Sequence, residues 1–354
     1  MTHTELNALG MRLRSEGDLG GARTAFEQAI ALAPGEPEPR HHLAGVLARL
    51  GDPEAAKAEY RRVLALAPGH GPTSRALAEL LLADGEYEEG FALWELRHEV
   101  ADRAKPSLAF PEWRGEPVAG KKLLIWPEQG LGDQMMFARF APVLRDMGAD
   151  VTLICWPALA PLFEASLGVR VLPATGAVEF PDPDYWAMTM TLAGRLGLGP
   201  DALPTQPYLR TTGPGPRLPA GFKVGLVTIA GAQLPGVSSR SLPADQALRL
   251  TALPAQVIDL SPASTGAKDF ADTAAIVEQL DLVISVDTSA AHLAGAMGKP
   301  VWVIVPAPSD WRWMRGREDS PWYPTARVYR QPKPGDWASV VDRVIEDFGA
   351  LAKA

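Results

Sequence analysis

Residues 43–68, LAGVLARLGDPEAAKAEYRRVLALAP, carry a pattern that recurs at a spacing of 34 residues along the first hundred positions. Three kinds of side chain keep this register, namely a leucine, a glycine and an aromatic residue: Leu9, Leu43 and Leu77; Gly17, Gly51 and Gly85; Phe26, Tyr60 and Trp94. A small residue also recurs, as Ala22, Ala56 and Gly90, and Pro34 and Pro68 close the first two copies.

A 34-residue period with these residues at the helix contact, the inner turn and the end is typical of tetratricopeptide repeats. Each repeat is a helical hairpin that buries its apolar face only by stacking on its neighbours. We therefore expect residues 1–104 to form a helical stack whose groove binds a protein or peptide. Three repeats are near the minimum for a stable stack, so self-association through the repeats is a further expectation.

The charge of the chain is concentrated in these repeats. Eleven Lys/Arg against seventeen Asp/Glu give residues 1–104 a net charge of −6, out of −8 for all 354 residues. Nucleic acid is therefore not expected as a partner, because phosphate binding requires a basic face.

The composition is that of a soluble globular protein of two or three domains, with 47% hydrophobic and 21% charged residues. The polar N-terminus lacks the apolar segment of a signal peptide, and no run approaches the ~18 apolar residues of a membrane helix. A single cysteine, Cys155, suits a reducing compartment. These features predict a cytoplasmic protein without a membrane span. Because only His292 of the six histidines lies beyond His98, we expect no metal site in the C-terminal part.

Behind the repeats the sequence period changes. Residues 105–120 are rich in Pro and Gly and are read as a linker that packs through Phe110 and Trp113. Short apolar runs at 122–126 and 151–155 then alternate with helical patterns at 135–147 and 159–167. After a second linker at 213–221 the alternation restarts, with strands expected at 224–229, 257–260, 282–286 and 301–305 and a closing helix at about 336–351.

Strands that alternate with helices predict parallel sheets. The sequence thus predicts two α/β halves, residues 121–212 and 222–354. Two such halves would form a cleft at the carboxyl ends of their strands, where ligands bind in open sheets.

The first loop that could carry chemistry is PEQGLGDQ, residues 127–134. Gly130 and Gly132 allow a tight turn, and Asp133 lies at the start of the next helix. Asp133 could simply cap the helix, or it could point into the cleft. A dinucleotide site is disfavoured, because the loop lacks a third glycine and the next strand does not end in an acid.

The second loop is DTSAAH, residues 287–292. Thr288 and Ser289 would place hydroxyls and backbone amides at a helix N-terminus, which suits a phosphate. The alternative is that Asp287 or Thr288 caps the helix. His292 either donates to a phosphate or is an ordinary helix histidine.

Two further segments are candidates. In residues 231–242, Ser239 and Arg240 could clamp a phosphate, since guanidinium suits that geometry. Residues 310–324, DWRWMRGREDSPWYP, could stack on a base or sugar, or pin the last helix across the two halves.

Five motifs in this order resemble bacterial tetratricopeptide-repeat glycosyltransferases whose catalytic part is similar to the heptosyltransferase family. They are EQGLGDQ at 128–134, DFADTAA at 269–275, ISVDTSAAHLAGAMGKPVWV at 284–303, DWRWMRGREDSPWYP at 310–324 and RQPKPGDWASV at 330–340. The resemblance implies an α plus α/β architecture: a repeat stack followed by two Rossmann-like halves of the GT-B type. The first half would hold the acceptor and the second the nucleotide sugar.

The resemblance also implies site residues and chemistry. The reaction would be an inverting transfer without a metal or a cofactor, apart from the nucleotide-sugar co-substrate, and Asp133 would be the general base. The implied donor-binding residues are Asp287, Thr288, Ser289, Ala290, His292, Ser239 and Arg240. Supporting positions are expected at Glu128, Gln129, Gly130, Gly132, Gln134, Trp311, Arg312, Trp313, Glu318 and Asp319.

One segment departs from the family pattern. Where relatives carry Trp-Ala-Gly-Asn-Pro and a His/Lys-rich continuation before Arg-Ser, residues 228–239 read TIAGAQLPGVSS. Three functions therefore stay open. The chain could transfer a sugar to a protein acceptor such as a flagellin, which relatives of this layout modify. It could transfer a sugar to a glycan or lipid carrier. It could also be a repeat scaffold with a degenerate glycosyltransferase-like part.

Overall fold

A computed structural model describes residues 1–99, 105–211, 213–231 and 240–351. The chain divides into two compact units. The repeat unit comprises Met1–Ser107 together with Asp310–Met314, and the α/β unit comprises Leu108–Ser309 and Arg315–Ala354.

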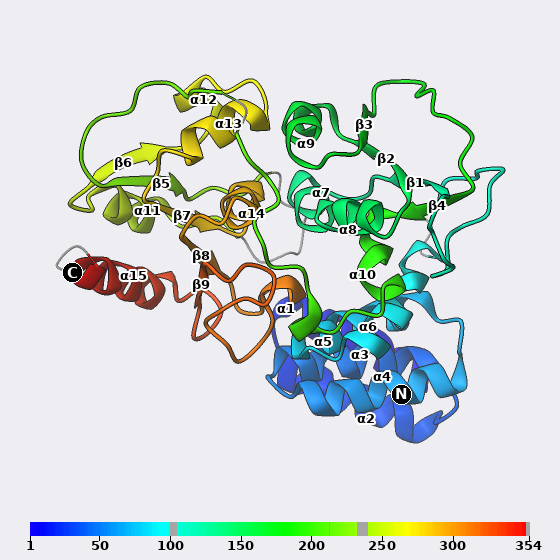
Figure 1. Cartoon of the computed structure of the whole chain (residues 1–354). Coiled ribbons are helices and arrows are strands. Elements are labelled where there is room, and N and C mark those ends of the chain that lie inside the picture. The colour runs from blue at the N-terminus through cyan, green and yellow to red at the C-terminus, as the bar shows by residue number, and fades with distance from the viewer. Residues whose placement is uncertain (100–104, 212, 232–239, 352–354) are drawn as a thin grey trace. The chain divides into compact units, whose positions relative to one another are not determined.

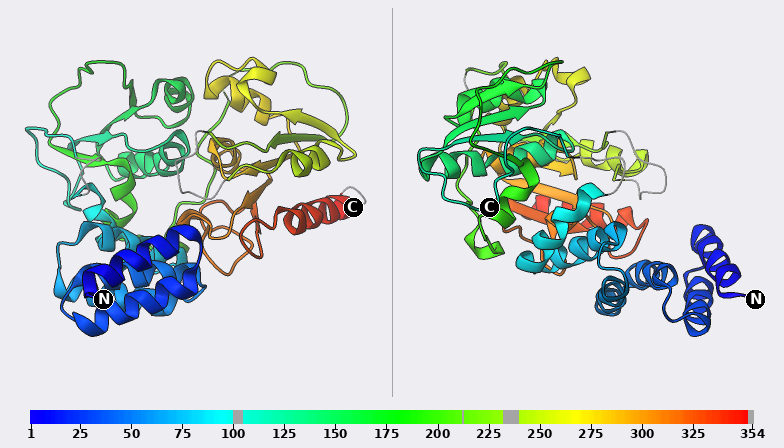
Figure 2. Two further views of the ribbon diagram at one scale, coloured as in Figure 1. Left: turned by 180° about the vertical axis from the view of Figure 1, so that it is seen from behind. Right: turned by 90° about the vertical axis from the view of Figure 1, so that its right-hand side faces the viewer.

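The repeat unit contains three helical hairpins, as the 34-residue period predicts (Figures 1 and 2). The helix pairs are α1 (His3–Glu16) with α2 (Leu19–Leu32), α3 (Pro37–Arg49) with α4 (Pro53–Leu66), and α5 (Gly71–Asp84) with α6 (Tyr87–Trp94). The periodic glycines Gly17, Gly51 and Gly85 follow α1, α3 and α5 with φ values of 89°, 87° and 83°. Other residues rarely adopt this left-handed conformation, which explains the glycine at each inner turn.

The other periodic positions pack the hairpins together. Phe26, Tyr60 and Trp94 are buried, as are Ala22 and Ala56. A methyl group added at Gly90 would lie 2.9 Å from the side chain of Leu82, so this position requires a residue without a Cβ.

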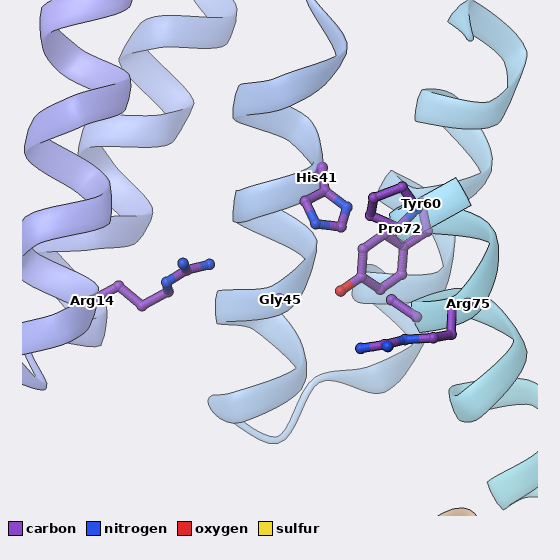
Figure 3. A pocket seen from close by; sticks show the side chains of 7 residues that line it. Arg14, His41, Gly45, Tyr60, Pro72 and Arg75 are labelled. Atoms are coloured by element: carbon purple, nitrogen blue, oxygen red, sulfur yellow. The ribbon is translucent and has the colours of Figure 1, made fainter. Parts of the chain in front are cut away.

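His41 lies beside Tyr60 in this stack (Figure 3), and His70 of the next repeat lies next to it. The ring of His41, on α3, lies 5.6 Å from that of Tyr60 and 5.3 Å from that of His70. Its Nδ1 lies 2.8 Å from the hydroxyl oxygen of Thr73, on α5. Burial, reinforced by the neighbouring His42 and His70, lowers the pKa of His41 to about 4.

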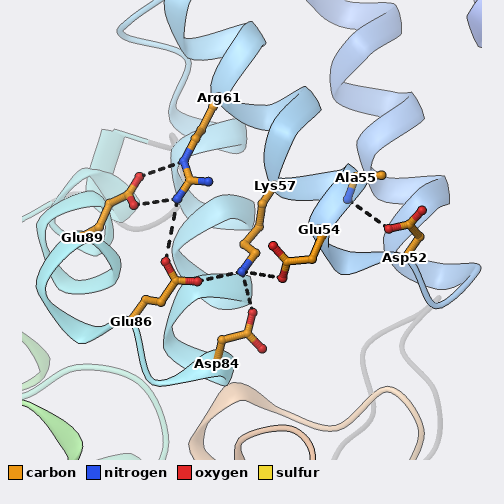
Figure 4. A network of polar contacts seen from close by, with 8 residues as sticks. All are labelled: Asp52, Glu54, Ala55, Lys57, Arg61, Asp84, Glu86 and Glu89. Carbon is orange, nitrogen blue, oxygen red and sulfur yellow. Dashed lines mark hydrogen bonds and ion pairs between the residues drawn. The ribbon is translucent and has the colours of Figure 1, made fainter.

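A buried lysine bridges the second and third repeats (Figure 4). The Nζ of Lys57, on α4, lies 2.7 Å from a Glu54 oxygen, 2.8 Å from Asp84 and 2.7 Å from Glu86. Burial alone would lower the pKa of Lys57, but the hydrogen bonds to Asp84, Glu54 and Glu86 outweigh it and raise the pKa. Because Asp84 and Glu86 flank the turn at Gly85, this cation fixes that turn against α4.

The first sheet of the α/β unit has four parallel strands in the order β3-β2-β1-β4. They are β1 (Lys122–Trp126), β2 (Asp150–Cys155), β3 (Arg170–Pro173) and β4 (Tyr185–Met188). The helices of this part are α7 (Leu131–Ala138), α8 (Phe140–Asp146), α9 (Ala160–Ser166) and α10 (Leu192–Arg195). The sequence predicts one helix over 135–147, but the structure has two that meet at Arg139. Pro142, in the first turn of α8, cannot donate the hydrogen bond that would continue α7.

The second sheet has five parallel strands in the order β6-β5-β7-β8-β9. They are β5 (Lys223–Val227), β6 (Gln256–Asp259), β7 (Leu282–Val286), β8 (Val301–Val305) and β9 (Ala326–Arg330). Its helices are α11 (Ala244–Thr251), α12 (Pro262–Thr265), α13 (Phe270–Val277), α14 (Ser289–Ala296) and α15 (Trp337–Leu351). The predicted parallel α/β architecture is therefore confirmed.

Both sheets have a topological switch point, where the strand order reverses and ligands bind in open α/β sheets. In the first sheet it lies between β1 and β4, and in the second between β5 and β7. The loops that follow β1 and β7 are the two loops that the sequence singles out. None of the helices in the described ranges is both long and apolar enough to cross a bilayer.

We predict that acid destabilises the repeat unit through His41. The native chain binds a proton there only near pH 4, whereas the unfolded chain binds it near the ordinary pKa of 6.5. The unfolded state therefore holds more protons between these values, so stability is lost as the pH falls from about 6.5 to about 4. Urea unfolding followed by helical circular dichroism from pH 7.5 to 4.5 would measure this slope.

The matched variant is His41→Gln, whose amide can still bond the Thr73 hydroxyl but does not titrate. It should flatten the dependence of stability on pH, leaving the part contributed by His42, whose pKa burial also lowers. A slope identical to that of the unchanged chain would refute the role of His41.

Candidate functional site

The loop after β1 places Asp133 at the N-terminus of α7. Gly130 is the N-cap residue, and Asp133 is the third residue of the helix. An Asp133 carboxylate oxygen, Oδ2, accepts the backbone N–H of Gly130 at 3.0 Å. The carboxylate thus caps the start of α7, which is one of the two roles that the sequence leaves open for Asp133. The same bond orients it at the carboxyl edge of the first sheet.

Glu128 closes the switch point of the first sheet. Its buried carboxylate accepts the backbone N–H of Met190 at 2.7 Å, in the segment that follows β4. In the same segment, the Thr189 hydroxyl donates a hydrogen bond of 2.7 Å to the Trp126 carbonyl. Glu128 therefore holds the two loops of the switch point together.

Gln134 and Gln129 both hold Trp156, which follows β2. The side-chain oxygen of Gln134 accepts the Trp156 backbone N–H at 3.0 Å, and the Trp156 indole N–H donates to the Gln129 carbonyl at 2.9 Å. Trp156 keeps 40% of its surface exposed. Our sequence reasoning missed this anchored, exposed indole, although a Trp directly after a buried strand is a visible signal.

The loop after β7 brings Asp287 and His292 together with Arg240 at the start of α14. The buried Asp287 carboxylate lies 3.3 Å from Nη1 of Arg240 and 3.9 Å from Nε2 of His292. The Thr288 hydroxyl lies 3.0 Å from that of Ser285 and makes no side-chain cap bond to α14. Thr288 thus occupies the N-cap position of α14, as the capping alternative holds, but its side chain does not cap the helix. Ser289 and Ala290 form the first turn of the helix.

Tyr323 sets the orientation of His292. Its hydroxyl lies 3.0 Å from Nδ1 of the buried imidazole, which leaves Nε2 on the side of Asp287. Complete burial raises the pKa of the Tyr323 phenol well above its ordinary value, so the phenol is a neutral partner. Sequence reasoning did not single out Tyr323, because its place beside His292 depends on a contact between segments 31 residues apart.

The two loops meet at Gly132. A Cβ placed there would lie 2.7 Å from Cδ2 of His292 and 3.5 Å from the Cα of Ser289. Helices α7 and α14 accordingly lie side by side (Figure 1). Asp133, the next residue along α7, therefore shares its neighbourhood with the start of α14. The structure thus places Gly132 of the first loop against Ser289 and His292 of the second.

Arg139 anchors this contact at the end of α7. The guanidinium is 2% exposed and donates to the carbonyls of Met136 at 2.8 Å, Pro204 at 3.1 Å and Trp322 at 2.7 Å. It also donates to the Tyr208 hydroxyl at 3.2 Å. It faces the ring of Tyr323, whose centroid lies 4.8 Å from its Cζ. Sequence reasoning missed Arg139 because an isolated Arg in a helix is usually a surface residue.

The segment 310–324 divides between the two units. Three of its residues belong to the repeat unit and are buried: Trp311, Arg312 and Trp313. The ring centroid of Trp311 lies 6.0 Å from that of Phe91 and 5.9 Å from that of Trp94. The expectation that these three side chains stack on a base or sugar needs correction, since the structure uses them for packing.

The rest of the segment supports the last helix. Glu318 accepts from Arg343 of α15 at 2.8 Å and lies 3.7 Å from Arg327 of β9. Asp319 pairs with Arg317, and that hydrogen bond lowers the pKa of the Asp319 carboxyl. Ser239 lies outside the described residues, as does most of the segment that departs from the family pattern. In the described part of the chain, no group of three His, Cys, Asp or Glu side chains is arranged to hold a metal ion.

Comparisons with known proteins agree with the repeats and extend to nearly the whole chain. The profile of the family described as tetratricopeptide repeat matches residues 13–62. Protein FlbA of Caulobacter vibrioides is 30% identical in an alignment that covers 97% of this chain and 67% of that protein.

Solved structures also match over part of the chain. The type III secretion translocator chaperone SycD of Yersinia enterocolitica has 21% identity and a TM-score of 0.27, covering 29% of this chain and 77% of that one. The first repeat domain of Spaghetti, bound to an HSP90 peptide, has 17% identity and a TM-score of 0.27, covering 28% of this chain and 79% of that one.

We predict that Gly132→Ala destabilises the α/β unit. The added methyl group would overlap the His292 ring, and overpacking of this kind costs about 1–3 kcal/mol, more than the helix gains from alanine. Urea unfolding would measure the loss. Gly199→Ala is the control, because a methyl group there meets nothing within 4 Å. Equal stability of the two variants would contradict the close contact at Gly132.

Proposed function

The chain belongs to the FlbA family, and from this premise we propose that it is an inverting glycosyltransferase. The α/β unit would bind a nucleotide sugar, and the repeats would bind a protein acceptor. The observation that carries the proposal is the contact of Gly132 with His292 and Ser289. It brings the only acid of the α7 N-terminus to the start of α14, where a phosphate would bind.

In the proposed reaction, Asp133 takes the proton of an acceptor hydroxyl while that oxygen forms a bond to the anomeric carbon. The bond between this carbon and the phosphate oxygen breaks, and the nucleotide leaves with the electron pair. The charge on the leaving phosphate is stabilised by the amides and hydroxyls at the start of α14 and by Arg240. The family resemblance implies no metal for this step.

Asp287 has a positioning role in this scheme. Its carboxylate is buried and pairs with Arg240, whose side chain is 44% exposed. The pair holds the guanidinium at the carboxyl end of β7 while leaving part of it accessible to a phosphate. On its other side, Asp287 faces Nε2 of His292, so the carboxylate lies between the guanidinium and the imidazole.

Tetratricopeptide repeats typically bind peptides, which favours a protein acceptor over a glycan or lipid carrier. A flagellin-like acceptor follows from the family resemblance alone. The second candidate function is a repeat scaffold without transfer activity. It is favoured by the sequence of residues 228–239, where the Trp, Asn, His and Lys of related enzymes are missing.

Nucleotide binding separates these candidates. Thermal unfolding would be followed with CMP, UDP, GDP and ADP and with their sugar conjugates. A ligand at a hundred times its dissociation constant adds about 2.7 kcal/mol to the folded state. An enzyme should select one nucleotide, and Arg240→Ala should reduce that shift. If no nucleotide shifts the transition, the scaffold function is favoured.

We predict that Asp133→Asn abolishes transfer without loss of donor binding. The asparagine oxygen can still accept the Gly130 N–H, so the start of α7 is preserved, but the amide cannot take a proton. The thermal shift with the selected nucleotide sugar should be unchanged, while acceptor-dependent nucleotide release falls by about 10²-fold or more. Asp201→Asn, at an exposed carboxylate, is the control. Full turnover in the Asp133 variant would remove this residue from the base role.

A further inference from the structure

The repeat unit contains a small pocket with an unusual charge. Its volume is about 220 Å³, and it lies between α1, α3, α4 and α5 (Figure 3). Its walls are two arginines, two rings and small residues: Arg14, His41, Gly45, Tyr60, Pro72, Arg75 and Ala76. Small-molecule sites are usually larger, from roughly 300 Å³, so this pocket has the size for one or two side chains of a peptide.

The lining is positive although the repeats are acidic. Arg14 and Arg75 are charged, whereas His41 is neutral at pH 7 because burial lowers its pKa to about 4. No carboxylate is among the lining residues. Among the described residues Arg14 forms no ion pair, and Nε of Arg75 lies 3.5 Å from Glu79 in an exposed pair. Such exposed pairs are weak and yield readily to a ligand.

The pocket also offers a neutral hydrogen-bond donor. The hydroxyl of Tyr60 points toward Gly45 in Figure 3, and it would lie 3.6 Å from a Cβ at that position. Burial raises the pKa of this phenol to about 12, so the group keeps its proton and can donate. Two guanidinium groups and a phenol are donors that suit a carboxylate.

The glycine at position 45 keeps this side of the pocket open. A glycine inside a helix is less favourable than alanine by roughly 0.5–1 kcal/mol. Gly45 lies within α3, where a methyl group would meet only the Tyr60 hydroxyl, at an ordinary contact distance of 3.6 Å. Packing within the repeat unit therefore does not require glycine here, and the missing side chain leaves space in the pocket beside α3.

We propose that this pocket binds an acidic side chain, Asp or Glu, within a peptide segment of the protein that the repeats hold. The carboxylate lies between Arg14 and Arg75, and an adjoining apolar residue of the peptide packs on Tyr60 and Pro72. This inference rests on the proposed function in one respect: it takes the bound peptide to be part of the acceptor protein.

The test uses the full-length chain and random 12-residue peptides displayed between constant flanks, so that only side chains supply carboxylates. We expect the selected peptides to share an Asp or Glu at one position. Changing this residue to its amide should weaken binding by at least about tenfold, the scale of a charge-assisted hydrogen bond. A selection without a shared acid, or without any enriched sequence, overturns the proposal.

Variants of the chain assign the binding to the pocket. Arg14→Ala and Arg75→Ala should each weaken binding of the selected peptide by about tenfold. Arg12→Ala, on the exposed side of α1, is the matched control and should leave binding unchanged. Gly45→Ala should raise the temperature of unfolding and reduce peptide binding. If Gly45 had only a structural role, the variant would not lose peptide binding while gaining stability. Unchanged binding in the two arginine variants contradicts the proposal.

Two further measurements keep the outcomes separate. The selected peptide with its acid changed to the amide, but with a free C-terminal carboxylate, should stay weak. If it regains binding, a chain terminus is the ligand and the proposed side chain is not. The thermal shifts with nucleotides are measured without the peptide, so failure of the pocket and failure of the proposed donor binding are distinguishable.

Discussion

The arrangement of the α/β unit depends on one buried cation, Arg139. Removing a guanidinium from water costs several kcal/mol unless its hydrogen bonds are replaced, and here carbonyl groups and a phenol replace them. These acceptors come from α7 itself, from the segment before the second sheet and from Trp322. The end of α7 is thereby fixed to Trp322. The next residue, Tyr323, orients His292, whose ring lies against Gly132. The bonds of one desolvated charge thus connect the end of α7 with the segment that orients His292.

The two loops divide the charges of the candidate site between the sheets. The α7 side presents a carboxylate, Asp133, held by a backbone amide. The α14 side presents a helix N-terminus and Arg240, with Asp287 between that arginine and His292. Each set lies at the switch point of its own sheet, so the parallel topology itself brings them to the edges where ligands bind. This distribution of charge is what the proposed transfer requires, with its anionic donor and its hydroxyl acceptor.

Much of this fold could be predicted from the sequence, and the failures have physical causes. The repeats were predictable because their register recurs, and β1, β2, β5, β7 and β8 because their apolar runs are compact. Strands β3, β4 and β9 were missed, since β3 and β4 have only four residues each and β9 mixes charged with apolar residues. Tyr323 and Arg139 were missed because their partners are distant along the chain. Stacking on a base or sugar stayed open as one of two uses for Trp311, because sequence alone does not reveal that its ring packs on Phe91 and Trp94.

Gly132 and Gly45 show why residue type alone does not identify a site. Both lie in helices, where alanine would be the better helix former. At Gly132 the space is filled by His292 of the facing helix, so the absent side chain allows two parts of the protein to approach. At Gly45 the same absence leaves a pocket wall open, with only the Tyr60 hydroxyl nearby. The first glycine is required by the protein's own packing, whereas the second costs helix stability without an internal contact in return. This difference is why we assign a ligand to the pocket at Gly45, and it becomes visible only when the neighbours of each position are known.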